Sequence, residues 1–294
     1  MAGDLIRYEQ RPRGLFGLLR NAMEKWTVAQ GGQELEARLG RLVAPQNEYG
    51  VDPFGLELDF TKAAVAPVLW LYRNYFRVET HGVANVPPGR AMLIANHSGQ
   101  LPLDAAMLGL SLLLEAEPPR IARAMVEKWA PTLPFVAPLF ARVGQVVGTP
   151  ENCKRLLAAG ETIMVFPEGV RGLNKTYEKR YQLQEFGLGF MRIALETGAP
   201  IVPVAVIGAE EQAPAFFDFK AAAKLLGMPA LPITPTLLPL PLPVKYHLWF
   251  GPPLQFEGSP HDDDAELERK VAQVRAAIVA LLDQGLAARG GKIF

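Results

Sequence analysis

Hydrophobic residues recur along the chain in two alternating patterns. Short uninterrupted apolar runs are typical of strands buried on both faces of a sheet. Longer stretches in which apolar residues return every three or four positions are typical of one buried helix face. The runs predict strands at 76–80, 91–95, 121–125, 162–166, 201–207 and 245–250. The longer stretches predict helices at 15–26, 33–42, 60–76, 131–142, 150–159 and 187–197, one starting at Pro102, and one starting at the acidic residues 262–264.

This alternation predicts an α/β protein with a single mixed, largely parallel sheet flanked by helices and an N-terminal helical extension. No internal repeat and no long linker interrupts the sequence, so we expect one α/β domain over 60–294 and the helical extension over 1–59. The amphipathic stretch 15–26 within that extension either lies on a membrane surface or docks on the core.

Composition and charge exclude several classes of protein. Thirty basic and thirty acidic residues cancel, so no basic field points to a nucleic-acid partner. Cys153 is the single cysteine, which excludes an internal disulfide and fits a reducing compartment. The first residues lead into arginine-rich sequence without an apolar core, so we expect no signal peptide. The longest uncharged run, Leu225 to Val244, has the roughly 20 residues of a membrane span, but its six prolines preclude a helix. We therefore expect no spanning helix.

The first candidate site follows the apolar run 91–95. There Asn96-His97-Ser98-Gly99-Gln100-Leu101 leads into the helix that begins at Pro102, a residue suited to a first helical turn. Reactive groups in an open α/β sheet gather at the carboxyl ends of strands. Asp104, in that first turn, could accept an N–H from the His97 ring and leave the other ring nitrogen free as a base. On spacing alone, a polar turn explains the pair equally well.

The second candidate site is Phe166-Pro167-Glu168-Gly169-Val170-Arg171, which directly follows the apolar run 162–166. A carboxylate and a guanidinium three residues apart, with a glycine that permits close backbone approach, suit a polar or phosphorylated substrate. A solvated charged loop is the simpler alternative for this stretch taken alone.

Together the two stretches resemble the first and third motifs of the glycerolipid acyltransferase family, whose best-known members are lysophosphatidic acid acyltransferases. Phe140-Ala141-Arg142-Val143-Gly144 stands where the second motif is expected, and 201–206 looks like the fourth. The resemblance covers roughly residues 76–251. It is closest to a bacterial branch with Asn-His-Ser-Gly in the first motif. The family usually has four residues between the histidine and the acid, whereas this chain has six, from Ser98 to Leu103.

The resemblance implies a role for each residue of the candidate sites. His97 would be the general base that activates an acceptor hydroxyl, and Asp104 would orient it. The backbone N–H groups of Ser98 and Gly99 would stabilise the oxyanion. The substrate-binding residues implied by the motifs, which would hold the lipid acceptor, are Arg142, Glu168, Gly169 and Arg171.

The resemblance also implies the substrates and the location of the protein. The donor would be acyl-CoA or acyl carrier protein as co-substrate, the acceptor a lysophospholipid, glycerol-phosphate or related lipid, and no cofactor would be required. The histidines and Cys153 show no metal-ligand spacing, so we expect no metal. The apolar runs 225–244 and 129–141 could reach into a leaflet and line an acyl groove. We therefore expect a peripheral, monotopic protein on the cytoplasmic side of the membrane.

Two alternatives remain open at this point. Ser98 could be a nucleophile in a lipid hydrolase or transacylase, although no Gly-x-Ser-x-Gly elbow occurs in the chain. Alternatively, the protein could bind lipid without catalysis on the same fold, for which the longer His97-to-Asp104 spacing is the only support.

Overall fold

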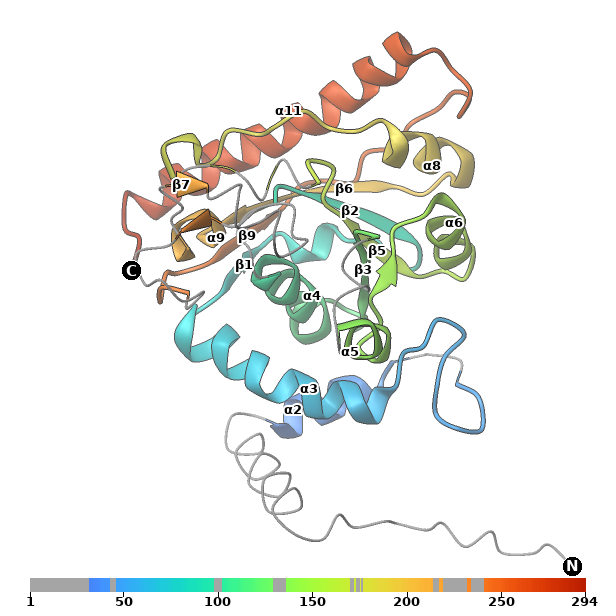
Figure 1. The fold of residues 1–294 in the computed structure, drawn as a ribbon, viewed down its shortest axis with the longest axis vertical. Helices are drawn as coiled ribbons and strands as arrows, with labels where there is room; N and C mark the ends of the chain where they lie inside the picture. The colour runs from blue at the N-terminus through green and yellow to red at the C-terminus, as the bar shows by residue number, and fades with distance from the viewer. Residues whose placement is uncertain are drawn as a thin grey trace, which may run out of the picture.

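The computed structural model describes residues 32–42, 46–97, 102–128, 136–169, 172, 175, 177–213, 217–218, 232–233 and 241–294. They form a sheet of seven strands flanked by helices (Figure 1). Neighbouring strands are parallel, except that β6 is antiparallel to β9. The predicted mixed, largely parallel sheet is therefore confirmed. The strand order is β1 (Glu79–His81), β9 (His247–Phe250), β6 (Ile201–Ile207), β2 (Ala91–Ala95), β5 (Thr162–Val165), β3 (Ala122–Val126) and β4 (Val146–Val147).

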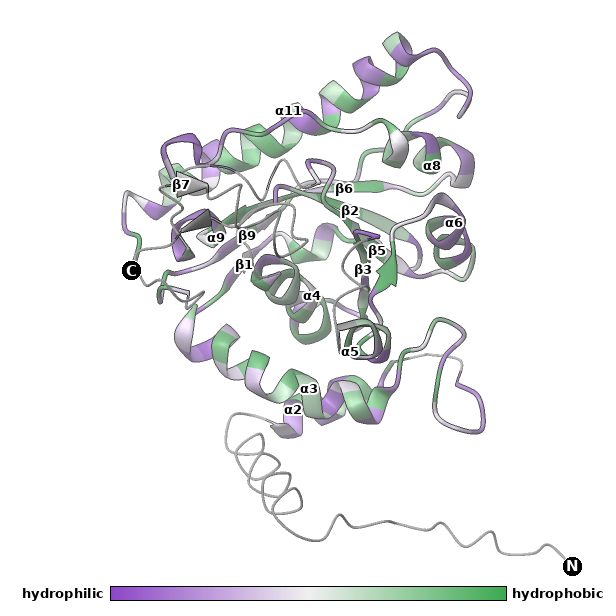
Figure 2. Cartoon of the chain, viewed as in Figure 1, coloured by the Kyte–Doolittle hydropathy of each residue, from purple (hydrophilic) through white to green (hydrophobic). Residues whose placement is uncertain are grey.

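Two layers of helices cover the two faces of the sheet (Figure 1). Every residue of β2 and β6 is buried, as parallel strands covered on both faces require, and Figure 2 shows the hydrophobic colour along both. One layer contains α2 (Gly32–Gly40), α3 (Leu58–Trp70) and α4 (Leu103–Glu115), with α5 (Val136–Arg142) beside α3. The other contains α6 (Pro150–Ala158), α8 (Gly189–Thr197) and α11 (Asp264–Arg289).

Shorter elements complete the described chain. They are the π-helical η1 (Leu71–Tyr75), the 3-10 turns η2 (Val83–Asn85) and η4 (Tyr177–Lys179), the short helix α9 (Ala209–Gln212), and the antiparallel pair β7 (Phe217–Asp218) and β8 (Pro232–Ile233).

Local sequence signals explain where the helices on the second face begin and end. Thr149 caps α6 by accepting the Asn152 N–H at 3.2 Å, and Pro150 occupies the first turn, where its missing N–H costs nothing. Asp263 caps α11 by accepting the Glu266 N–H at 2.8 Å. These caps place both helices close to their predicted positions.

The C-terminal helix α11 covers the sheet. By length and composition it is the one helix in the described part of the chain that is long and apolar enough to cross a membrane. It nevertheless packs against β6 and β9, with a regularly spaced apolar stripe buried in the core: Leu267, Val271, Val274, Ile278 and Leu282. In this structure its apolar face is therefore part of the protein core.

Two strands of the seven-stranded sheet, β1 and β4, differ from the prediction. The first strand was expected at 76–80, but Phe76 ends the helical segment and is fully buried there, so β1 begins only at Glu79. The strand β4 was not predicted because it has two residues, too few for any periodicity to appear.

The helical extension is docked on the α/β domain from α2 onward. Arg38 of α2 donates to the carbonyl oxygen of Ala116 at the end of α4, at 2.9 Å, and α3 packs against α4 and α5. The amphipathic stretch 15–26 lies outside the described residues, as do 129–135 and most of 225–244. The boundary at residue 59 stays a prediction.

Candidate active site

Asn96 fixes the point at which the chain leaves the sheet after β2. Its amide nitrogen donates to the carbonyl oxygen of Val206 at 2.9 Å, and its amide oxygen accepts the Val206 N–H at 2.7 Å. The side chain is buried, so it extends the pairing of β2 with β6 by one position without exposing backbone groups. His97 therefore starts its loop at the carboxyl end of the sheet, where open α/β folds place reactive groups.

His97 and Asp104 are in direct contact. Nδ1 of His97 lies 2.6 Å from Oδ2 of Asp104, as expected from the sequence. Pro102 is the N-cap of α4, so Asp104 falls in the first turn. Its carboxylate is fully buried, whereas the imidazole is 15% exposed. Because a carboxylate only accepts hydrogen bonds, the proton of a neutral His97 lies on Nδ1 and Nε2 keeps its lone pair. This is the arrangement of an oriented base.

The loop that follows β5 packs against His97. The Phe166 ring stacks on the imidazole, with ring centroids 4.4 Å apart. Glu168 accepts the backbone N–H of His97 at 3.0 Å through Oε1 and that of Gln184 at 2.7 Å through Oε2. The Glu168 side chain is fully buried. The role expected for Glu168, holding the acceptor, does not fit this position, because both oxygens are already bonded within the protein. Glu168 instead joins the two candidate stretches.

Lys175 lies between two buried carboxylates. Its Nζ is 3.1 Å from Oε2 of Glu168 and 3.0 Å from Oε1 of Glu210, and the side chains of Lys175 and Glu210 are 4% exposed. Burial raises the pKa of Glu210, and the charge of Lys175 opposes that rise. Glu210 also accepts the backbone N–H of Tyr181 at 2.7 Å. These contacts tie the Glu168 loop to the start of α9.

Two glycines allow the Glu168 loop to approach His97. A β-carbon at Gly172 would lie 3.1 Å from the carbonyl oxygen of His97 and 3.0 Å from the β-carbon of Glu168, closer than real β-carbons usually come. Gly169 has φ of +53°, a conformation that favours glycine, and its N–H closes a turn onto Phe166. Gly169, expected to bind substrate, therefore shapes the loop.

Arg142 contacts α3 and not the His97–Asp104 pair. Its guanidinium forms two hydrogen bonds with Glu57, at 2.9 and 2.8 Å, and lies over the Phe60 ring, 3.7 Å from its centroid. The side chain is 43% exposed. The pair with Glu57 uses Nε and one terminal nitrogen of the guanidinium, and the role in acceptor binding that the resemblance implies for Arg142 stays a prediction.

The remaining predicted site residues, Ser98, Gly99 and Arg171, lie outside the described residues. Their expected roles stay predictions.

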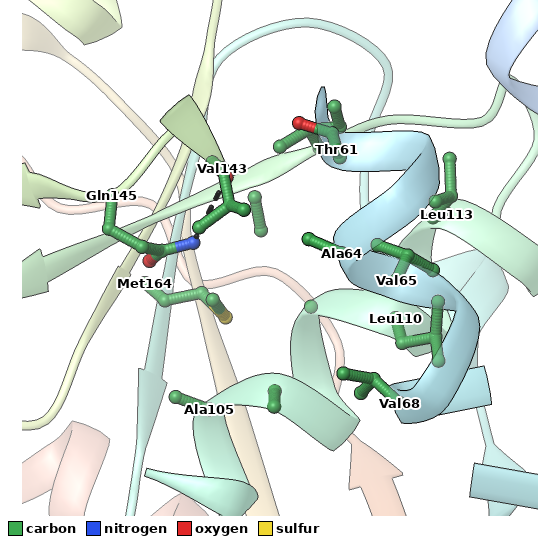
Figure 3. Close-up of a pocket in the computed structure, with 14 residues that line it drawn as sticks. Thr61, Ala64, Val65, Val68, Ala105, Leu110, Leu113, Val143, Gln145 and Met164 are labelled. Atoms are coloured by element: carbon green, nitrogen blue, oxygen red, sulfur yellow. Dashed lines mark hydrogen bonds between the residues drawn. The ribbon is translucent and has the colours of Figure 1, made fainter. Parts of the chain in front are cut away.

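An apolar cavity of about 150 Å³ lies between α3, α4 and the sheet. Figure 3 shows Ala64, Val65 and Val68 of α3 on one side and Met164 of β5 on the other. The lining is apolar apart from Thr61 and Gln145, which both hydrogen-bond to backbone carbonyls of the protein. The cavity reaches Ala105, whose N–H donates to Asp104 at 2.7 Å. It therefore reaches the residue that follows Asp104 in the sequence, although neither His97 nor Asp104 lines it.

Sequence reasoning missed Glu210 and Tyr181 as members of the buried network. Glu210 follows β6 at its carboxyl end, so the strand-end rule that selected His97 and Glu168 could have found it. Tyr181 offered no such signal, because it reaches the network through a loop remote from any predicted strand end.

The amino-acid sequence is similar to those of known proteins. The family model described as Acyltransferase matches residues 77–207. An uncharacterized protein of Mycobacterium tuberculosis (strain ATCC 25618 / H37Rv) is 39% identical over 260 residues, which cover 84% of this chain and 72% of that protein. A Gallus gallus protein named DGAT1/2-independent enzyme synthesizing storage lipids is 26% identical over 213 residues, 71% of this chain and 60% of that one.

A solved structure is similar in fold. The crystal structure of the 1-acyl-sn-glycerophosphate (LPA) acyltransferase PlsC from Thermotoga maritima matches with a TM-score of 0.50 and 16% identity. The match covers 91% of this chain and 97% of that one.

Proposed function

The chain belongs to the glycerolipid acyltransferase family, and on that premise we propose that it transfers a fatty acyl group from a thioester donor to a lipid hydroxyl, with His97 as general base. The donor is acyl-CoA or acyl carrier protein. The acceptor is a lysophospholipid, glycerol-phosphate or related lipid. The contact between Nδ1 of His97 and the buried Asp104 carboxylate, at 2.6 Å, carries this proposal.

The reaction proceeds by direct attack of the acceptor. Nε2 of His97 takes the proton of the acceptor hydroxyl as its oxygen attacks the thioester carbonyl carbon. The tetrahedral intermediate then collapses, the carbon–sulfur bond breaks, and the thiolate takes the proton from the imidazolium and leaves as a thiol. Asp104 keeps a proton on Nδ1 and stabilises the imidazolium. Help of this kind typically accelerates a reaction by about 10²–10⁴, roughly 3–5 kcal/mol.

Four residues complete the proposed site. Backbone N–H groups of Ser98 and Gly99 stabilise the oxyanion of the intermediate. Arg171 binds the phosphate or other anionic group of the acceptor. Glu168 contributes indirectly, because its bond to the His97 backbone N–H holds the base in place.

The cavity between α3 and α4 is proposed to bind the acyl chain. It is apolar and reaches Ala105, the residue that follows Asp104 in α4, so an acyl chain inside it would lie along the helix that carries Asp104. A volume of about 150 Å³ is close to that of an engineered cavity that accepts a benzene-sized molecule. A long acyl chain therefore requires α3 to move away from α4, or leaves its end outside the cavity.

Two neighbouring alanines of α3 test the acyl-chain assignment. Ala64 lines the cavity (Figure 3), whereas Ala63 on the same helix is exposed. Ala64→Phe fills part of the cavity, so it is expected to shift donor preference toward shorter chains in a competition between acyl-CoAs. Ala63→Phe is the matched control and leaves the preference unchanged. Identical chain-length profiles for the two variants would reject the cavity as the acyl site.

Association with the membrane is proposed to be peripheral, on the cytoplasmic side. The chain has no net charge, so attachment rests on burial of apolar side chains, at roughly 1.5–3 kcal/mol for each large one. Liposome flotation tests this. A protein that stays with the soluble fraction in the absence of detergent would contradict it.

Thiol release with and without acceptor tests the proposed reaction itself. The purified protein is given acyl-CoA or acyl carrier protein and a panel of acceptors that includes lysophosphatidic acid, monoacylglycerol and diacylglycerol. This panel follows from the names of the Thermotoga and Gallus proteins, which refer to an acyltransferase for 1-acyl-sn-glycerophosphate and to the synthesis of storage lipids. We expect acceptor-dependent thiol release that falls by about 10²–10⁴ in His97→Ala. Release that survives this substitution, or that occurs equally without acceptor, would reject the proposal.

A further inference from the structure

Three potential metal ligands gather at the edge of the sheet farthest from β4. Glu79 and His81 come from β1, and His247 comes from β9. One candidate ligand atom from each lies within 4.8 Å of the other two. The cluster belongs to a strand pair that carries none of the candidate catalytic residues.

The strand geometry explains why these three side chains meet. Residues two apart on a strand point to the same face of the sheet, which brings together Glu79 and His81. The parallel register places His247 of β9 beside Glu79, and Trp249 beside His81. All four side chains therefore share one face, and Oε2 of Glu79 lies 3.4 Å from Nδ1 of His247.

One ring nitrogen of the cluster has no partner. Nε2 of His81 is buried and makes no hydrogen bond within the described chain. The His81 ring is held by stacking on Trp249, with centroids 4.0 Å apart and planes 19° from parallel. A buried polar atom without a partner costs free energy, and a metal ion bound at that nitrogen would remove this cost.

We propose that Glu79, His81 and His247 form a binding site for a divalent transition-metal ion of the zinc type. Two imidazoles and one carboxylate are a common zinc ligand set, with bonds of about 2.0–2.2 Å and a fourth position for water. Tetrahedral coordination at these lengths places ligand atoms roughly 3.3 Å apart. Oε2 of Glu79 and Nδ1 of His247 are already 3.4 Å apart, so the closing movement on metal binding falls on the distances to His81, which are within 4.8 Å.

Lys245 competes with the metal for the carboxylate. Its Nζ is 2.5 Å from Oε1 of Glu79, and its side chain is 33% exposed, so it can turn into solvent. The other nearby cation, Arg289 of α11, forms two hydrogen bonds with Glu211 at 2.7 and 2.8 Å. The charge that opposes metal binding therefore comes mainly from Lys245, and replacing it by methionine is expected to tighten binding.

The bound ion would secure the edge of the sheet. β1 has three residues and pairs with β9 alone, and it connects the α3–η1 segment to the α/β domain. A metal held by both strands adds a cross-link to this short ladder and stabilises the folded chain by mass action.

Metal titration of the full-length chain tests the site. The affinity tag is removed, the protein is stripped with a chelator, and ZnCl₂ is added in a calorimeter, with CoCl₂ absorption spectra as a second readout of histidine ligation. We expect one ion per chain, a higher melting temperature with zinc, and affinity at least about tenfold weaker in His81→Ala and in Glu79→Gln. Lys245→Met should bind more tightly than the unmodified protein.

The chain contains four histidines, and the two outside the cluster supply matched controls. His261→Ala removes an exposed histidine, and His97→Ala removes the candidate base, and both should bind zinc as the unmodified protein does. Binding that persists in Glu79→Gln and His81→Ala, binding that disappears in His97→Ala, or no one-to-one binding at all would overturn the proposal. None of these outcomes depends on acyl transfer.

Discussion

Replacing Asp104 by asparagine removes one charge from the site and nearly preserves its shape. In the protein, Oδ2 of Asp104 meets Nδ1 of His97 at 2.6 Å, and Oδ1 accepts the Ala105 N–H at 2.7 Å. If the carboxamide oxygen keeps the bond to Ala105, its NH₂ group faces Nδ1. Two donors cannot share that contact, so the imidazole proton moves to Nε2. The nitrogen that should act as base is then protonated.

The size of the effect follows from the burial of this contact. The Asp104 side chain is fully buried, so water does not replace the lost carboxylate. We expect kcat to fall by about 10²–10⁴, roughly 3–5 kcal/mol of transition-state stabilisation. The hydrogen bond to a charged group also contributes about 1.5–3 kcal/mol to folding, so the melting temperature should fall moderately. KM for the donor should change little, because the carboxylate oxygens of Asp104 do not line the proposed acyl cavity.

The assay is thiol release from acyl-CoA at saturating acceptor, with folding followed by circular dichroism. Ser111→Ala is the matched control, since Ser111 is also a buried polar residue of α4 and its hydroxyl bonds only to the carbonyl oxygen of Leu108, at 2.7 Å. The control should keep kcat. An Asp104→Asn protein that is folded and retains kcat within about tenfold of the unmodified enzyme, below the usual range for a general base, would refute the assigned role.

Three further substitutions separate stability from catalysis. Lys175→Met leaves two buried carboxylates without their shared cation, so we expect a loss of about 3–5 kcal/mol in denaturant unfolding together with a lower kcat. Asp52→Asn weakens the buried ion pair with Arg123 and should lower the free energy of unfolding by up to about 3–5 kcal/mol, while kcat per folded molecule stays unchanged. Equal losses of kcat in Lys175→Met and Asp52→Asn would contradict this separation of stability from catalysis. Burial raises the pKa of Cys153 from 9.0 to about 11. Between these values the unfolded chain has lost the thiol proton and the folded chain keeps it, so this contribution to stability falls as pH rises from 9 to 11. Cys153→Ala should flatten that fall in melting temperature, and native Cys153 should resist iodoacetamide at pH 8.

The sequence was sufficient to predict the contact between His97 and Asp104 because apolar runs indicate where the strands end. β2 and β5 were predicted almost to the residue, and His97 and Glu168 come two and three positions after their last residues. The sequence did not indicate the role of each residue that follows a strand end. Glu168 looks like a substrate ligand in the motif, yet its surroundings satisfy both of its oxygens. Only the packing of the loops distinguishes these two roles.

Pairings between distant segments account for features that the local sequence pattern did not indicate. The motif predicts that Arg142 binds substrate, whereas the structure pairs its guanidinium with Glu57, the N-cap of α3. The histidines were judged by spacing along the chain, and His81 and His247 are far apart in sequence. Their proximity depends on the register between β1 and β9, which follows from sheet topology and not from local pattern.

The longer spacing between histidine and acid is compatible with a working pair because each partner is fixed independently of the loop between them. His97 is held at the sheet by the Asn96 amide on one side and by Glu168 at its own N–H. Asp104 is held by α4, whose next turn is anchored in the core through the fully buried Met107 and Leu108. The helix starts at Leu103, so the additional residues of this chain precede it. The 2.6 Å contact therefore depends on these two anchors, and a shift of the acid along α4 would rotate it by about 100° per residue and remove it from the imidazole.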